Sequence, residues 1–323
     1  MDVVQFRSAL LRWYRKNGRD LPWRRTRDPY AILVSEIMLQ QTQVATVLPF
    51  YDAWLRRFPN FESLARASQS NVLHAWQGLG YYARARNLHA AAKIIARDHA
   101  GNFPRDIAQS QELPGIGRYT ANAVATFAFD QSAPLVEANT ARVLARIFNM
   151  RRSIDSSIGR EKLWRHATEL LPRRAAALFN SALMDVGALI CTARAPKCRS
   201  CPVQKFCRAK DPLSLPRKKS RPKVLRHTER HAFIFRRDQI LLEKSSERWR
   251  NMWILPPLNA TRSTYRALHI AQFPFTNHRI TLAVFPAAIR QRKANEDWFS
   301  IRALDSIPIP SPHRRAIVDL VAL

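Results

Sequence analysis

Two acidic side chains stand in or beside apolar stretches, where a carboxyl group could take part in chemistry. Glu36 lies inside the run from Ile32 to Leu48, whose apolar arc is too wide for a surface helix, so we expect this run to be largely buried. Burial raises the pKa of a carboxyl, as a general acid requires. The alternative is a Glu36 side chain that points outward or pairs with an arginine. Glu137 stands beside a second apolar stretch, in Leu-Val-Glu-Ala-Asn.

The segment 113–147 combines Glu137 with a turn that could hold a phosphate group. Gly115 and Gly117, in Leu-Pro-Gly-Ile-Gly, predict a tight turn that opens a helix. The free N–H groups of a helix N-terminus bind phosphate, and Arg118 adds a cation there. A phosphate site and a carboxylate on one segment indicate chemistry on nucleic acid. The alternative is a helical hairpin with a surface glutamate.

Four cysteines lie close together and have the spacing of metal ligands. The pattern is C-x6-C-x2-C-x5-C, and it contains no histidine. Cysteines clustered in a larger chain indicate a metal site in a reducing compartment, and four thiolates suit zinc or a 4Fe-4S cluster. Only one pair has the two-residue spacing of zinc sites, which favours one 4Fe-4S cluster. The ligands would be Cys191, Cys198, Cys201 and Cys207.

The charge of the chain predicts a polyanionic partner. Its 323 residues include 53 basic and 24 acidic side chains, a formal charge of +29. Nucleic acid is the first candidate and an anionic membrane surface the second. No apolar run is long enough to span a membrane, and the N-terminus predicts an amphipathic helix rather than a signal peptide. We therefore expect a cytoplasmic, nucleoid-associated monomer.

The elements that must position these residues fall into two kinds. Residues 1–207 predict helix after helix, and Asp28-Pro29 has the pattern of a helix start. Residues 208–228 form a linker with eight basic residues against one acidic residue. Residues 229–323 predict a small α+β domain. Its expected elements are strands at His231–Arg236, Gln239–Glu243, Ile280–Phe285 and Trp298–Ile301, and a closing helix at His313–Leu323.

Two polar segments of the helical part could contact bases. Gln40, Gln41 and Thr42 directly follow Leu39 within the apolar run, and their side chains could hydrogen-bond to base edges. The segment 78–87 combines glycines, arginines and paired tyrosines, including Tyr81, as stacking surfaces and phosphate contacts would require. Its alternative is a loop that caps a helix over 82–100.

Taken together, the motifs resemble the adenine DNA glycosylases of base-excision repair, a branch of the helix-hairpin-helix glycosylases that includes endonuclease III. The resemblance implies a mostly α glycosylase domain at 1–207, with a helix-hairpin-helix motif at 113–120 and an iron-sulfur loop at 191–207. It also implies a Nudix-like lesion-recognition domain at 229–323 that lacks the Nudix box. The matching stretches are Leu21–Arg24, Ser35–Val44, Gly78–His89, Leu113–Thr120, Asn139–Arg146 and the four cysteines.

The resemblance also implies a reaction and its catalytic residues. Such enzymes bind double-stranded DNA with a mismatch or an oxidised guanine, flip out adenine opposite 8-oxoguanine or guanine, and hydrolyse its glycosidic bond. Glu36 matches the acid that protonates adenine on N7, and Glu137 matches the carboxylate that stabilises the sugar cation. Asn139 matches an orienting residue. Tyr119 replaces the Schiff-base lysine of bifunctional relatives, which implies a monofunctional enzyme.

By the same resemblance, further residues bind the DNA. Trp23 and Arg24 match the wall of the adenine pocket, while Gln41 and Tyr81 match residues that wedge into the base stack. The remaining residues expected at the DNA are Gln40, Thr42, Gly115, Gly117, Arg118, Ser181, Thr276, Asn277 and His278.

Three positions depart from the family pattern. Glu137-Ala138 replaces Asp-Gly, and misplacing a reacting group by about 1 Å can cost 100-fold in rate. Ser181 replaces a longer Glu or Gln in the pocket. The Phe-Ser-His loop that senses 8-oxoguanine becomes Phe-Thr-Asn-His at 275–278, where a small shift could bring His278 into the missing position.

These departures leave other functions open. One is a glycosylase for thymine or uracil opposite guanine, and another is a weakly active protein that binds DNA damage, as Glu137 would allow. Independently of these departures, a further hypothesis is a basic, zinc-containing DNA-binding protein without enzymatic activity.

Overall fold

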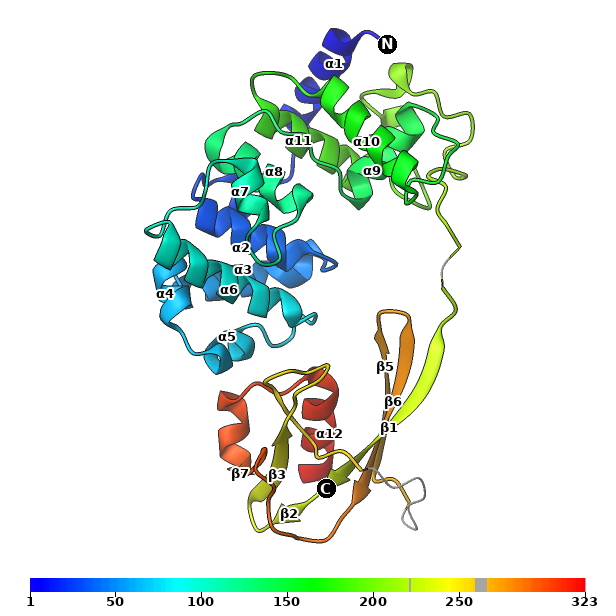
Figure 1. Ribbon diagram of the computed structural model, residues 1–323. Helices are drawn as coiled ribbons and strands as arrows, with labels where there is room; N and C mark the ends of the chain where they lie inside the picture. The colour runs from blue at the N-terminus through cyan, green and yellow to red at the C-terminus, as the bar shows by residue number, and fades with distance from the viewer. Residues whose placement is uncertain (221, 259–265, 323) are drawn as a thin grey trace. The chain divides into compact units, whose positions relative to one another are not determined.

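The computed structural model describes residues 1–220, 222–258 and 266–322 (Figure 1). The chain forms two compact units, each made from two separate stretches of sequence. One unit comprises Met1–Gln41 and Ile94–Ser220, and the other comprises Thr42–Lys93 and Arg221–Leu323. The division into 1–207, 208–228 and 229–323 remains a prediction.

The first unit is helical, as the sequence predicts. Helix α1 packs against α11, and α2 packs against α8. Phe6 and Leu10 of α1 enter a core shared with Leu144 of α9 and Phe179 of α11. The elements are α1 (Val3–Asn17), the 3₁₀ turn η1 (Pro22–Arg24), α2 (Pro29–Leu39), α7 (Ile107–Gln111), α8 (Arg118–Phe129), α9 (Ala138–Ile147), α10 (Ser157–Leu170), α11 (Ala176–Asp185) and the π turn η2 (Val186–Ile190).

Helix α2 begins at a capping residue that the sequence identifies. The Asp28 side chain accepts hydrogen bonds from the backbone N–H groups of Tyr30 and Ala31, and Pro29 occupies the first turn, so the predicted helix start is confirmed. The helix ends at Leu39, so the apolar run expected from Ile32 to Leu48 is divided between two helices. Within helix α2, the residues from Tyr30 to Met38 are all buried.

The turn between α7 and α8 is the hairpin that the two glycines predict. Gly115 has a φ of +77°, a conformation that side chains with a Cβ rarely adopt. Gly117 is extended and forms the N-cap of α8, where no side chain of the described residues provides a cap. The first N–H groups of α8 are therefore available to a ligand.

The second unit contains further helices and the small C-terminal domain. Its helical elements are α3 (Val44–Arg57), α4 (Phe61–Arg66), α5 (Gln69–Ala75) and most of α6 (Ala83–Asp98), which continues into the first unit. The ring of Trp54 packs edge-on against Phe58 and Trp76, with centroids 5.0 and 5.3 Å away.

The C-terminal part is an α+β domain with two small sheets. In one sheet, β6 (His278–Pro286) pairs in parallel with β1 (Leu225–Phe233) and antiparallel with β5 (His269–Phe275). In the other, β3 (Gln239–Lys244) pairs with β2 (Phe235–Arg236), β4 (Trp253–Ile254) and β7 (Glu296–Ser300). Helix α12 (Ser311–Val321) shares a core with both sheets through Ile317, Leu282 and Leu242.

The predicted strands at Gln239–Glu243, Ile280–Phe285 and Trp298–Ile301 are present with longer or shifted bounds, and β4 and β5 are additional. The stretch predicted as one strand at His231–Arg236 is divided between β1 and β2, which belong to different sheets. Strand β5 escapes sequence reading because none of its residues is fully buried and Pro274 interrupts its pattern. The last residue of the predicted closing helix, Leu323, lies outside the described residues. No helix in the described ranges is long and apolar enough to cross a membrane.

Candidate active site

Glu36 is a buried acid at the centre of the candidate site. It lies on α2 with 5% of its surface exposed. Burial is the largest cause that raises the pKa of Glu36 to about 7, because water no longer solvates the carboxylate. The predicted burial of this residue is therefore found, and the carboxyl is poised to exchange a proton at neutral pH.

Three groups from other elements act on the Glu36 carboxyl. The Tyr119 hydroxyl at the start of α8 donates a hydrogen bond to it, which lowers the pKa of Glu36. The negative charge of Glu137 raises that pKa, and the positive charge of Arg24 lowers it. Glu36 and the three groups that act on it thus come from four separate segments of the chain.

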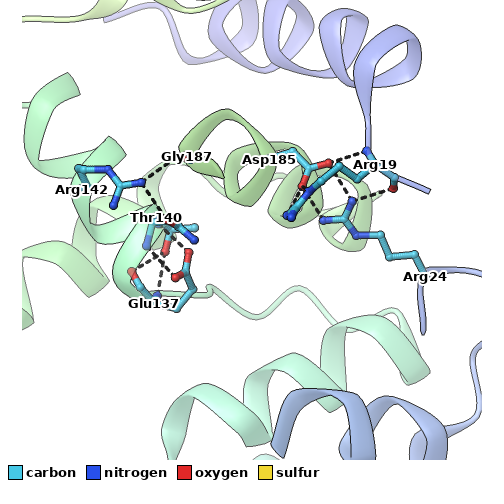
Figure 2. Close-up of polar contacts among 8 residues, drawn as sticks. Arg19, Arg24, Glu137, Thr140, Arg142, Asp185 and Gly187 are labelled. Atoms are coloured by element: carbon cyan, nitrogen blue, oxygen red, sulfur yellow. Dashed lines mark hydrogen bonds and ion pairs between the residues drawn. The ribbon is translucent and has the colours of Figure 1, made fainter. Parts of the chain in front are cut away.

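Glu137 is fixed by the helix that follows it (Figure 2). Its carboxylate accepts hydrogen bonds from the backbone N–H groups of Asn139 and Thr140, at 2.6 and 2.8 Å. The Thr140 hydroxyl in turn accepts a bond from the Glu137 N–H at 2.8 Å, which completes a capping box. Burial raises the pKa of Glu137, while the two N–H donors oppose that rise.

A second network ties α9 to the segment that enters the cysteine loop. The Arg142 guanidinium donates to the side-chain oxygen of Asn139 at 2.8 Å and to the carbonyls of Gly187 and Cys191 at 2.7 Å. A Cβ atom on Gly187 would lie 2.7 Å from the Asn139 Cβ, so only glycine permits this approach. Asn139 is therefore held from its backbone by Glu137 and from its side chain by Arg142.

The expected pocket wall is also held in place. Trp23 is 7% exposed, and Ser181 on α11 is likewise buried. The Arg24 guanidinium donates two hydrogen bonds to the Asp185 carboxylate, at 2.8 and 2.9 Å. Such a bidentate pair fixes the plane of the guanidinium.

At the hairpin, Gly115, Gly117 and Arg118 are exposed. The Arg118 guanidinium lies 4.0 Å from the centroid of the Trp164 ring and 3.9 Å from a carboxylate oxygen of Glu161. Arg118, the first residue of α8, thus stacks against the Trp164 ring of α10.

The residues expected to enter the base stack have unusual backbone conformations. Gln41 has a φ of +57° and Tyr81 a φ of +48°, and Tyr81 is 43% exposed. Left-handed conformations of such residues carry a cost and concentrate at functional sites. The neighbouring side chains are tied down: Gln40 donates to the Thr120 hydroxyl, and the Thr42 hydroxyl accepts from Arg84.

The expected lesion loop is the turn of the β5–β6 hairpin. Thr276, with a φ of +52°, and Asn277 form a two-residue turn, while His278 pairs with Phe275 across the strands. His278 also lies edge-on to His227 at 5.1 Å. Bringing His278 into the turn therefore requires a change of strand register, which would move every side chain of β6 to the opposite face.

The four cysteines share one loop and act on one another. Burial raises the pKa of Cys201 to about 11, and the other three thiols contribute in the same direction. Arg146, which is 2% exposed, donates to the Cys191 sulfur at 3.3 Å and to the carbonyls of Thr192 and Ala193. Within the described ranges, no three acidic, histidine or cysteine side chains are grouped so as to hold a single metal ion.

Comparison with known proteins assigns this architecture to a family. Residues 34–169 match the HhH-GPD superfamily of base excision DNA repair proteins. An adenine DNA glycosylase of Homo sapiens is 43% identical over 65% of this chain and 40% of that protein. An adenine DNA glycosylase of Buchnera aphidicola (subsp. Schizaphis graminum, strain Sg) is 31% identical over 98% of this chain and 99% of that protein.

The chain belongs to the adenine DNA glycosylase family. It spans about two fifths of the length of the human relative. Among solved structures, a thermostable thymine-DNA glycosylase is 35% identical, with a TM-score of 0.60 over 64% of this chain and 95% of that one. The predicted helix-hairpin-helix glycosylase fold, followed by a small α+β domain, is thereby confirmed.

Sequence reasoning missed several residues that organise the site of this adenine DNA glycosylase family member. Arg142 and Thr140 stand on a helix with ordinary polar residues and give no signal by type or spacing. Asp185 does give one, because it is an acid inside the apolar helix α11, the same signal that singles out Glu36.

Replacing Glu36 by Gln removes the proton donor and keeps the shape of the side chain. We expect base release from mismatched duplex DNA to fall by roughly 10²- to 10⁴-fold, the usual contribution of general acid catalysis. Single-turnover kinetics measure this loss, and DNA affinity and melting temperature serve as controls. A rate within a few-fold of the wild type would contradict the assignment.

Replacing Tyr119 by Phe removes the hydrogen bond that favours ionised Glu36. The pKa of Glu36 should rise, because that bond lowers it. Since a general acid works only while protonated, the decline of activity at high pH, expected near pH 7 in the wild type, should move upward. A pH–rate profile of both proteins checks this shift, and a shift to lower pH would refute it.

Proposed function

We propose that this protein is a monofunctional DNA glycosylase that removes adenine mispaired with 8-oxoguanine or guanine. The observation that carries the proposal is the buried Glu36 carboxyl, with a pKa of about 7, beside the separately held Glu137 carboxylate. Paired carboxyls of unlike environment suit glycosidic bond cleavage, since one donates a proton while the other stabilises the sugar cation.

In this proposal the adenine leaves the base stack before the bond breaks. Glu36 protonates N7 of the flipped base, which makes it a better leaving group. Glu137 faces the positive charge that develops on the sugar, and Asn139 orients the reacting groups. Tyr119 offers no amine for a Schiff base, so the product is an abasic site without strand cleavage.

DNA recognition is divided among several surfaces in the proposal. The hairpin glycines, the free N–H groups of α8 and Arg118 bind a backbone phosphate. Gln41 and Tyr81 enter the stack, while the Thr276–Asn277 turn reads the strand that bears the lesion. The net charge of +29 favours binding to the duplex. We propose that the protein acts as a nucleoid-associated monomer.

The cysteine loop is proposed to hold one 4Fe-4S cluster. Cys191, Cys198, Cys201 and Cys207 would be its ligands. The position of the four thiols on one loop and the donors that Arg146 directs at the Cys191 sulfur and the neighbouring carbonyls support this proposal. Such a cluster, when bound, would stabilise a loop that contains little other structure.

Two observations support a second target base. The solved relative with 35% identity is a thymine-DNA glycosylase, and Ser181 is shorter than the family's pocket residue. Removal of thymine or uracil opposite guanine is therefore the competing activity.

A panel of duplexes distinguishes these activities. With adenine opposite 8-oxoguanine or guanine, and with thymine or uracil opposite guanine, we expect adenine release alone. Gel analysis without alkali should show intact strands, and borohydride should trap no covalent complex. Thymine or uracil as the main product would assign the competing activity, and binding without any release would indicate a damage-binding protein.

The bound metal can be tested on the purified chain. We expect equal amounts of iron and acid-labile sulfide, broad visible absorption, and loss of both after replacing Cys198 by Ala. The four-thiolate loop should unfold without its centre, which lowers the melting temperature. Stoichiometric zinc without iron would support the zinc alternative instead.

A further inference from the structure

Asp185 is a buried carboxylate that the proposed chemistry does not use. It ends α11 and is 0% exposed. Figure 2 shows two arginines converging on it. Arg24 donates to its two oxygens at 2.8 and 2.9 Å, and Arg19 donates through Nε and through its backbone N–H, both at 2.8 Å. Two guanidiniums thus share one buried carboxylate, so removing Asp185 would leave both without this counter-ion.

Both arginines also act on the candidate catalytic carboxyls. The charge of Arg24 lowers the pKa of Glu36, and the charge of Arg19 lowers the pKa of Glu137. The other groups that face Glu36 are Tyr119 from α8 and Glu137 at the start of α9. Because an arginine stays protonated at every relevant pH, its field at Glu36 persists across the pH range, and a counter-ion such as Asp185 offsets part of it.

We propose that Asp185 is a positioning residue for the glycosylase reaction, which fixes the Arg24 guanidinium beside Glu36 and neutralises part of its charge there. This inference rests on the proposed function. Without the carboxylate, Arg24 would favour ionised Glu36 more strongly, and the acid would lose its proton at a lower pH.

Replacing Asp185 by Asn tests the charge while it keeps the shape and one hydrogen-bond acceptor. Single-turnover base release is measured across pH for the wild type, Asp185→Asn, Arg24→Gln and the double variant. We expect the high-pH decline to move down by on the order of one pH unit in Asp185→Asn and up in Arg24→Gln. The double variant should follow Arg24→Gln, because the guanidinium that acts on Glu36 is then absent, while Arg19, which also loses its counter-ion, acts on Glu137.

Glu296→Gln is a matched control from the C-terminal domain. Glu296 is 1% exposed and accepts two hydrogen bonds from Arg290, at 2.7 and 2.5 Å. We expect this variant to lose melting temperature without moving the pH profile. A merely structural role of Asp185 would give the same result for Asp185→Asn.

The possible outcomes separate the inference from the function on which it rests. If the wild type releases no base from any duplex, the proposed function is wrong, and the inference that rests on it is wrong as well. If the wild type is active but the decline does not move in Asp185→Asn, or moves upward, the inference alone is overturned. If Asp185→Asn does not fold, Arg24→Gln decides: an upward shift supports the inference, and an unchanged decline contradicts it.

Discussion

The burial of one carboxyl group constrains how the first unit can be built. A buried glutamate on α2 loses the solvation of its charged form, so its protonation depends on the charged and polar groups of the elements packed around it. Here those elements present a hydroxyl from α8, a carboxylate from the start of α9 and a guanidinium from the turn before α2. The packing of α2 against α8 and the position of α9 therefore determine the chemistry of Glu36 as much as its own side chain does.

Helix ends hold most of the remaining groups. Glu137 is fixed because it caps α9, and Asn139 is fixed because Arg142 joins it to the Gly187 carbonyl. The same arginine reaches Cys191, so the cysteine loop and the second catalytic candidate share a support. The Glu137 side chain is one methylene longer than an aspartate, and it makes the two cap bonds of an N-terminal acid. The glutamate is thus part of the local fold as well as a catalytic candidate.

Much of this organisation could be predicted from the sequence. The helix start at Asp28-Pro29, the hairpin at Gly115 and the burial of Glu36 follow from capping rules, glycine conformation and apolar periodicity, which act over a few residues. The break after Leu39 was missed because apolar residues at helical spacing resume at Val44, so the sequence suggests one continuous run across the polar residues at 40–43. Strand β5 was missed because it lacks a buried face. Arg142 owes its role to the Gly187 and Cys191 carbonyls, which lie far away in sequence, and no local pattern records them. Asp185 is visible as an acid in an apolar helix, but its arginine partners are more than 160 residues away.

Glu36 should hold a proton near neutral pH within the folded protein. A titration of ¹³C-labelled glutamate carboxyls by NMR measures this directly, with the Glu36→Gln variant used to assign the resonance. We expect a midpoint at about pH 7 for Glu36. A midpoint near the ordinary glutamate value of 4.5 would contradict it, because the acid would then be ionised under the conditions in which it must donate its proton.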